Sequence, residues 1–328
     1  MCFNYSFFIK NKYFGLISII LLFLFSYLTL KCINYTKRGG YIIFQVPVNQ
    51  VELIKNIDIS DVNLDKDSTI LVDSVIKLPS SYSRFGSPVP LIMICHGAGK
   101  GVTGADNWTE NKNYNALVDT FVNNGYAVFD CNGYNNTPQG HEIWGAKRGI
   151  EVYRKAYQYV VDHYNVQKNF SIYGFSMGGC TALNLIFENM PNINCVVISS
   201  PVINLQACFE EDVNCSRSIN LAFGSPVDNK IFTDEMRNQN PMNRIINIDG
   251  KYYCLGKFPP LKIYFGENEI DQNGVNKRYA VILDNAISNS GGTSFYREVE
   301  GRGHEICYGE DEQMNREYLI FFNRYSYL

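Results

Sequence analysis

Histidine, tryptophan and strong charge are scarce in this sequence. Its 328 residues include four His and two Trp, and the formal net charge is −3. No basic stretch stands out, which argues against a nucleic-acid partner. No Cys-x-x-Cys or His-Glu-x-x-His motif occurs, so the residue spacing gives no zinc site. No internal repeat is evident either, which argues against a β-propeller.

Apolar and aromatic residues are abundant, with 46% hydrophobic residues, 23 Tyr and 21 Phe, as in a globular protein. Residues 13–30 are apolar and uncharged, and a helix over them could just span a hydrocarbon core of roughly 30 Å. We therefore predict a signal peptide or membrane anchor at residues 1–31. This segment is followed by a linker and first strand at 32–67 and then by a main domain at 68–328. This organisation predicts an exported or membrane-anchored protein whose main domain lies outside the cytoplasm.

Beyond residue 68, short apolar runs alternate with segments of helical periodicity. Strands are expected near residues 69–78, 91–95, 126–130, 170–173, 195–199, 261–265 and 294–299, and helices near 113–123, 146–164, 181–188, 277–288 and 313–322. Such alternation predicts parallel βαβ units in a doubly wound, mostly parallel α/β sheet. Residues 201–260 interrupt this alternation, and we predict that they form a lid-like insertion beside a pocket.

A Gly-x-Ser-x-Gly motif, Gly174 to Gly178, is the sharpest chemical signal. An apolar strand leads into it and an apolar helix leads out, the context that this motif requires. A serine on so tight a turn is pushed out of the sheet, and small residues on either side avoid collisions there. The following helix N-terminus offers N–H groups to a developing oxyanion. We therefore predict Ser176 as the nucleophile.

The segment His96-Gly-Ala-Gly directly follows an apolar strand. A turn of this kind presents backbone N–H groups at the strand end. We expect the N–H of Ala98, or that of Gly97, to join that of Met177 in holding the oxyanion. His96 itself is expected to form hydrogen bonds within the loop rather than act as a base.

The general base must come from the four histidines. His304 follows the last predicted strand, in a loop that can reach over the sheet to a serine several strands away. His163 lies on a predicted exposed helix face, and His141 lies in a polar loop that could border the pocket. We predict His304 as the base.

The acid that orients this base should follow the strand at 261–265, which gives the chain order Ser, acid, His. Glu269 is the first choice, as the fourth residue of a Gly-x-x-acid turn, and Asp271 is the alternative. A buried carboxylate there would fix the His tautomer and stabilise the imidazolium. A solvated acidic turn is the third interpretation.

Four motifs at successive strand ends, HGAG, GFSMGG, GENE and GRGH, together resemble the α/β-hydrolase superfamily. More narrowly, the chain is similar to esterases and prolyl-oligopeptidase-like serine hydrolases over most of residues 74–328. The resemblance implies the α/β-hydrolase fold, with Ser176 as nucleophile, His304 as base, and Ala98 and Met177 as oxyanion donors.

The sequence departs from this family pattern at two places. Glu269 stands where Asp is commoner, and the insertion 201–260 resembles no lid that can be assigned. The acid and the substrate class are therefore the open parts of the prediction.

The implied chemistry is two-step acyl transfer through an acyl-enzyme, with no metal or organic cofactor. A carboxylic ester, small or glycan-linked, is the expected substrate. Peptidases of the prolyl-oligopeptidase group usually carry a large N-terminal propeller, for which this chain has neither the room nor a blade-length repeat. That favours an esterase. A peptidase and a non-catalytic binding protein on the same fold are the alternatives.

Three aromatic residues, Trp108, Tyr134 and Trp144, lie in loops that follow strands and could form a sugar- or acyl-binding wall. Ordinary loop packing is the other interpretation. Cys208 and Cys215 flank a short polar loop and could form a local disulfide or stay as free thiols.

Overall fold

The computed structural model describes residues 34–38, 41–45, 49–58, 71–99, 112–133, 142–269, 275–304 and 311–326. The chain divides into two compact units, Met1–Val48 and Asn49–Leu328. In the first unit, β1 (Asn34–Arg38) pairs antiparallel with β2 (Tyr41–Gln45). The predicted apolar span at 13–30 lies outside the described residues. Within the described ranges, no helix combines the length and apolar character needed to cross a membrane.

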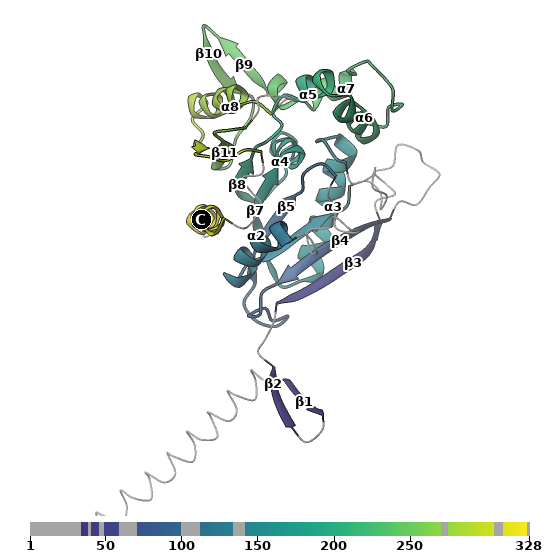
Figure 1. Ribbon diagram of the computed structural model, residues 1–328, viewed down its shortest axis with the longest axis vertical. Coiled ribbons are helices and arrows are strands. Elements are labelled where there is room, and N and C mark those ends of the chain that lie inside the picture. The colour runs from purple at the N-terminus through teal and green to yellow at the C-terminus, as the bar shows by residue number, and fades with distance from the viewer. Residues whose placement is uncertain are drawn as a thin grey trace, which may run out of the picture. The chain divides into compact units, whose positions relative to one another are not determined.

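The second unit is built on a sheet of eight described strands (Figure 1). Its strand order is β12-β11-β8-β7-β5-β6-β4-β3. Neighbouring strands from β6 to β12 run parallel, and β3 and β4 run antiparallel at one edge. The strands are β3 (Gln50–Asp58), β4 (Leu71–Leu78), β5 (Val89–Cys95), β6 (Ala127–Cys131), β7 (Val166–Phe175), β8 (Ile193–Ser199), β11 (Leu261–Gly266) and β12 (Ser294–Val299).

Helices cover both faces of this sheet, as its continuous apolar strands require. Side chains alternate between the faces, so Leu91 and Met93 join one core cluster while Ile92 and Ile94 join the other. The helices α3, α4 and α8 pack on the first face, and α2 and α9 pack on the second. Their bounds are α2 (Lys112–Asn123), α3 (Lys147–His163), α4 (Met177–Phe187), α8 (Lys277–Asn289) and α9 (Glu312–Tyr325). The predicted doubly wound, mostly parallel sheet is confirmed.

Strand β3 lies within residues 32–67, for which the sequence predicts a linker and a first strand. It pairs with β4 from Gln50 to Asp58, and the compact unit begins at Asn49 rather than at residue 68. The segment reads as a linker because charged residues interrupt its apolar ones. That alternation suits an edge strand, where Val51 is half exposed and Ile54 is buried.

The insertion between β8 and β11 has more regular structure than its sequence suggested. It contains three helices, a 3-10 turn and a hairpin, which Figure 1 shows at the upper end of the molecule. The elements are α5 (Leu205–Glu211), α6 (Val213–Ala222), α7 (Asp234–Asn238), η3 (Pro241–Arg244), β9 (Ile245–Ile248) and β10 (Lys251–Cys254). Side-chain caps from Asn204, Asp212 and Thr233 begin the three short helices, which is why they form without long periodic runs.

Candidate active site

Ser176 occupies a strained turn between β7 and α4. Its backbone has φ 53° and ψ −118°, a conformation in which a non-glycine residue is uncommon. The surrounding backbone holds it there, because the Ser176 N–H donates to the Ser199 carbonyl at 3.0 Å and its carbonyl accepts from the Val202 N–H at 3.0 Å. The side chain is thereby lifted above the carboxyl edge of the sheet.

The glycines of this turn are needed because the backbone packs too closely for a side chain. A Cβ on Gly178 would lie 1.8 Å from the Cys95 carbonyl oxygen, and one on Gly174 would lie 2.7 Å from the Gly178 oxygen. Both distances are below any real van der Waals contact. The Gly-x-Ser-x-Gly spacing therefore has the steric cause predicted from the sequence.

Three predicted residues meet through hydrogen bonds at the strand ends. His304, which follows β12, places Nε2 at 3.0 Å from the Ser176 Oγ, and its Nδ1 is hydrogen-bonded to Glu269 Oε1. Glu269 follows β11 and is 7% exposed. The arrangement can pass a proton from the hydroxyl to the imidazole while the carboxylate orients the ring.

Glu269, and not a solvated acidic turn, occupies the acid position in this geometry. Its second oxygen, Oε2, accepts a hydrogen bond of 2.6 Å from Ser200 Oγ. The alternative acid, Asp271, lies outside the described residues.

The predicted oxyanion donors lie beside the serine. Gly97 and Ala98 follow β5, and Ala98 lines the same pocket as Ser176 and His304. Met177 is the first residue of α4, so its N–H belongs to the first helical turn, which has no intrahelical acceptor. Gly97 packs against Phe175, whose ring lies 5.1 Å from that of His304.

The remaining histidines lie elsewhere or outside the described residues. His96 is buried, with Nδ1 3.1 Å from the Gly97 carbonyl oxygen, in keeping with a role inside the loop. His163 contacts the Tyr159 carbonyl at 2.8 Å and stacks on the Tyr159 ring. His141 is outside the described residues.

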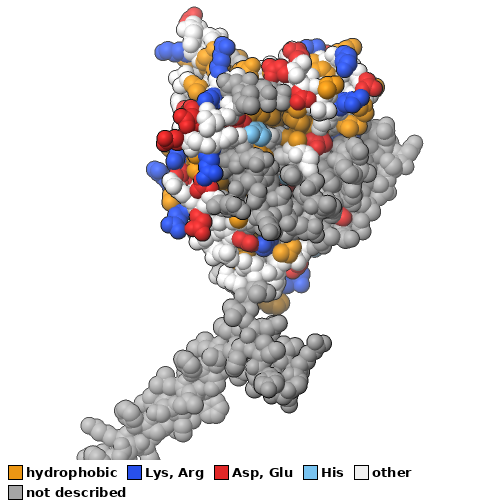
Figure 2. All heavy atoms as spheres, in the orientation of Figure 1, with side chains coloured by type: hydrophobic (Ala, Val, Ile, Leu, Met, Phe, Trp, Pro, Cys, Tyr) orange, Lys and Arg blue, Asp and Glu red, His pale blue; other side chains and the backbone are white. Residues whose placement is uncertain are grey.

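A pocket of about 450 Å³ opens onto the serine and the histidine. Its described wall is mainly apolar, and the insertion supplies Val202, Cys208 and Cys215 to it. Figure 2 shows hydrophobic side chains gathered beside a histidine on this face. Trp144 also lines the pocket. Trp108 and Tyr134 lie outside the described residues.

The two thiols that the sequence suggested as a disulfide, Cys208 and Cys215, are free. Both line the pocket, and hydrogen bonding to Cys215, together with burial, raises the pKa of the Cys208 thiol well above its ordinary value. In the ranges that the structure describes, no group of three or more His, Cys, Asp or Glu side chains is placed to hold a metal ion.

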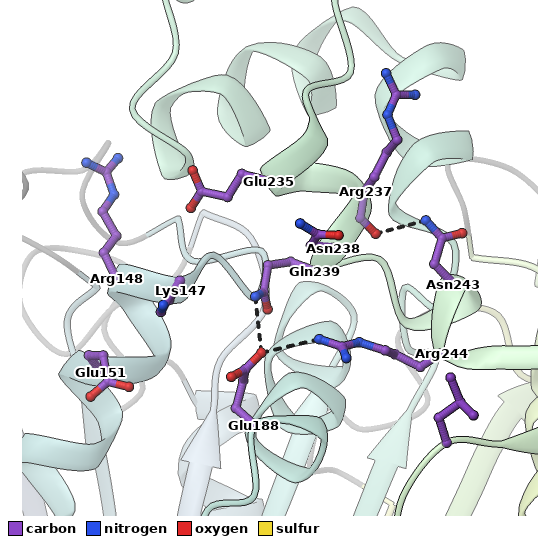
Figure 3. A pocket seen from close by; sticks show the side chains of 11 residues that line it. Lys147, Arg148, Glu151, Glu188, Glu235, Arg237, Asn238, Gln239, Asn243 and Arg244 are labelled. Atoms are coloured by element: carbon purple, nitrogen blue, oxygen red, sulfur yellow. Dashed lines mark hydrogen bonds and ion pairs between the residues drawn. The ribbon is translucent and has the colours of Figure 1, made fainter.

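A second, larger cavity of about 910 Å³ contains none of these residues (Figure 3). Charged and amide side chains from α3, α7 and η3 line it, together with Glu188 just after α4. Glu188 accepts hydrogen bonds from Gln239 at 3.3 Å and Arg244 at 3.4 Å across its floor. The cavity separates part of the insertion from the helices below it.

Two polar residues that support the site were not predicted. Ser200 binds the acid, and Glu142 accepts a hydrogen bond of 2.7 Å from the Gly99 N–H beside the oxyanion donors. Ser200 immediately follows β8, so its place at a strand end was the available signal. Nothing local marks Glu142, because its partners come from other parts of the chain.

Comparisons with known proteins agree with this geometry. A family model described as alpha/beta hydrolase fold matches residues 90–214. No curated protein matches the sequence. Solved structures that resemble the chain include peptidases and esterases.

Two of these structures are an acylaminoacyl peptidase from Pyrococcus horikoshii and oligopeptidase B from Leishmania major. The first has a TM-score of 0.61 and 12% identity, and the match covers 84% of this chain and 42% of the peptidase. The second has a TM-score of 0.58 and 10% identity, and covers 87% of this chain and 37% of the other. The chain thus spans less than half the length of these peptidases.

Thermogutta terrifontis esterase 2 matches with a TM-score of 0.56 and 13% identity, over 88% of this chain and 97% of the esterase. At such identities the likeness establishes the fold. The matched family model and the sheet show that the chain has the α/β-hydrolase fold, and its hydrogen-bonded Ser176, His304 and Glu269 have the arrangement of a catalytic triad.

Proposed function

We propose that this protein hydrolyses carboxylic esters with small, uncharged acyl groups. The observation that carries the proposal is the hydrogen-bonded series Ser176, His304 and Glu269 at the mouth of a mainly apolar pocket. In the described wall, the one charged carboxylate is that of Glu269, and it is already hydrogen-bonded to the base.

The geometry supports an acyl-enzyme mechanism. His304 Nε2 takes the proton of Ser176 as Oγ attacks the ester carbonyl carbon. The protonated imidazole then gives that proton to the leaving alkoxide. A water molecule, deprotonated by the same nitrogen, attacks the acyl-enzyme carbonyl. The C–O bond to Ser176 then breaks, His304 returns the proton to Ser176 Oγ, and the carboxylic acid is released.

Negative charge on the carbonyl oxygen needs donors that are already in place. The N–H groups of Ala98 and Met177 are the proposed pair, with Gly97 as the alternative to Ala98. Removal of one donor from such a hole typically costs about 10²–10³ in kcat.

Two observations support an ester rather than a peptide as the substrate. Among the described lining residues there is no Lys, Arg or Asp that could bind a charged peptide terminus or side chain. The likeness to an esterase over 97% of that protein's length supports the same choice. Peptide hydrolysis is the second candidate, favoured by the peptidase structures of the same fold.

The insertion at 201–260 is proposed to act as the lid of this site. It places Val202, Cys208 and Cys215 in the pocket wall, so it would contact the acyl group directly. A small or glycan-linked acyl ester is the proposed substrate class.

The test compares ester and peptide turnover with labelling of the serine. The full-length chain and its Ser176→Ala variant are incubated with a fluorophosphonate probe, p-nitrophenyl esters and peptide p-nitroanilides. We expect labelling and ester turnover that disappear in Ser176→Ala. Faster turnover of the anilides would favour the peptidase. A folded protein with neither labelling nor turnover would indicate a binding protein.

Membrane attachment through residues 13–30 is a separate proposal, based on the apolar, uncharged sequence of that segment. Sedimentation of the full-length chain with membranes, compared with a chain beginning at residue 32, tests it. Recovery of both proteins in the supernatant would contradict an anchor.

A further inference from the structure

Glu142 connects the insertion to the loop that carries an oxyanion donor. Its Oε1 accepts the Gly99 N–H at 2.7 Å, and its Oε2 accepts the Ser218 hydroxyl at 2.8 Å. Gly99 directly follows Ala98, and Ser218 lies on α6 of the insertion. One carboxylate therefore holds two segments that the chain separates widely.

Ser218 is also hydrogen-bonded to Trp144, a residue of the pocket wall. Ser218 Oγ accepts a hydrogen bond of 2.6 Å from Trp144 Nε1, and Trp144 lines the pocket with Ser176. Trp144 has a φ of 49°, a strained value for a bulky residue that the neighbouring contacts must hold in place. A shift of α6 would therefore disturb both Glu142 and the indole.

Ile143, which lies between Glu142 and Trp144, contacts Met177, the second proposed oxyanion donor. The N–H of Ile143 donates to Met177 Sδ at 3.4 Å. The three consecutive residues 142–144 thus touch the loop of Ala98, the first residue of α4, and α6. Both proposed oxyanion donors adjoin this short segment.

The Gly99 backbone needs such an anchor. Its φ is 71°, and no atom of the described residues would lie within 4 Å of a Cβ placed on it. A hydrogen bond to a carboxylate is charge-assisted and roughly twice as strong as a neutral one. Burial raises the pKa of the Glu142 carboxyl above its ordinary value, and the hydrogen bonds from Gly99 and Ser218 act in the opposite direction.

We propose that Glu142 is a positioning residue that couples the insertion helix α6 to the oxyanion loop through Ser218 and Gly99. The proposal rests on the proposed ester hydrolysis. It assigns no contact between Glu142 and the substrate. Its role is to fix the Ala98–Gly99 peptide through the Gly99 N–H. That constraint holds the adjoining Gly97–Ala98 peptide, which carries the Ala98 N–H, in the orientation that faces the oxyanion.

The variants that separate the two ends of this link are Glu142→Leu, Glu142→Gln and Ser218→Ala. The leucine removes both hydrogen bonds, whereas the glutamine can still accept from Gly99 through its amide oxygen. Ser218→Ala removes the link to α6 alone. Arg217→Gln is the matched control, because Arg217 lies beside Ser218 on α6 but binds the exposed Asp228.

The measurements are kcat and KM for a p-nitrophenyl ester and the affinity for a trifluoromethyl ketone, which forms a tetrahedral oxyanion adduct with the serine. Glu142→Leu should lower kcat by about 10- to 100-fold, less than or comparable to the loss of one donor. The KM should stay within about threefold, and ketone affinity should fall by a factor similar to that for kcat/KM. Glu142→Gln should keep most of the wild-type kcat and ketone affinity. Ser218→Ala should lower both quantities, but by less than Glu142→Leu does.

The outcomes separate this proposal from the proposed function. If the wild type neither turns over esters nor labels at Ser176, the proposed function fails. If the wild type is active but folded Glu142→Leu keeps its kcat and ketone affinity, the coupling is overturned. Should Glu142→Leu not fold, Ser218→Ala decides: ketone affinity equal to that of Arg217→Gln overturns the proposal, and a selective loss supports it.

Discussion

Ser200 Oγ lies 2.6 Å from Glu269 Oε2, so both oxygens of the buried acid are hydrogen-bonded. Ser200 is itself held at φ 43° and donates its N–H to the Tyr264 carbonyl at 2.8 Å. The end of β8 thus positions an acid that follows β11. A carboxylate fixed at both oxygens keeps one orientation toward His304.

Replacement of Ser200 by alanine should therefore leave Glu269 less well oriented toward His304. A hydrogen bond to a charged group is worth about 1.5–3 kcal/mol, and part of this should appear as a loss of about 3- to 10-fold in kcat. Ser199→Ala is the matched control, because no described residue hydrogen-bonds the buried Ser199 hydroxyl. Steady-state ester kinetics on both variants test the difference. Equal rates in the two would contradict the role given to Ser200.

The choice between the two predicted acids is tested by Glu269→Gln and Asp271→Asn. An amide at position 269 can donate to His304 Nδ1 and so favour the tautomer whose Nε2 carries a proton. That tautomer cannot accept the Ser176 proton, and similar changes lower kcat by about 10⁴-fold. We expect a loss on the order of 10²–10⁴ for Glu269→Gln and a small change for Asp271→Asn. The reverse pattern would assign the acid to Asp271.

The sequence located those site residues whose signals are local. Ser176 lies in a motif with a steric cause, and His304 and Glu269 follow apolar strands that a parallel sheet must align at one edge. Ser200 and Glu142 act through partners that lie 69 and 43 residues away along the chain. No periodicity or motif reports such pairs, because the fold alone brings them together.

The fold was predictable where burial is continuous. The strands β5, β6 and β8 are largely apolar runs, whereas β3 lies at the sheet edge and mixes charged with apolar residues, so the sequence pattern did not give its bounds. The insertion was irregular in sequence because its helices are short and depend on side-chain caps and tertiary contacts.

Gly178→Ala should destabilise the protein strongly. Its Cβ would lie 1.8 Å from the Cys95 carbonyl oxygen and 2.6 Å from that of His96, and backbone atoms cannot rotate away. Overpacking typically costs about 1–3 kcal/mol, occasionally more, and we expect the upper part of that range or above it. Urea unfolding measures the change. Gly250→Asn, at a hairpin turn with φ 80° and open space, is the control and should change stability little, since Asn tolerates this region.

Asp130 should make stability fall as the pH rises. It is fully buried on β6, where burial raises the pKa of its carboxyl well above the ordinary value, against hydrogen bonds from Tyr153 and the Cys131 N–H. The folded state therefore holds a proton that the unfolded state releases. That contribution to stability is complete below the ordinary pKa of about 3.9 and is lost as the pH rises through the raised folded pKa.

Asp130→Asn mimics the protonated carboxyl, so its unfolding free energy should lack this dependence. Relative to the wild type, the variant should gain stability as the pH rises from the ordinary pKa toward the raised folded pKa, by about 1.4 kcal/mol for each pH unit crossed. Urea unfolding across that range measures the gain. Asp162→Asn, on the exposed face of α3, is the control for loss of a carboxylate at the surface. An Asp130→Asn curve that runs parallel to that of the wild type would show that the carboxyl is ionised in the folded protein.

The pocket wall should set the length of the acyl group. Cys215 is half-buried on α6 and lines the pocket of about 450 Å³ with Ser176. Each methylene buried in such a pocket contributes about 0.8 kcal/mol, or roughly a fourfold gain in kcat/KM, until the space is filled. We therefore expect kcat/KM of the wild type to rise from acetate to a medium-length ester and then fall.

Cys215→Phe should move that maximum toward acetate, because the larger ring occupies the space of several methylenes. Cys208→Ala should move it the other way, since Cys208 is buried in the same wall and loses its sulfur atom. Cys254→Ala is the control, because Cys254 lies on β10 and is absent from the pocket lining. The measurement is kcat/KM over a series of p-nitrophenyl esters. If all three variants keep the wild-type length preference, the acyl group binds outside this pocket, and the insertion does not select the substrate.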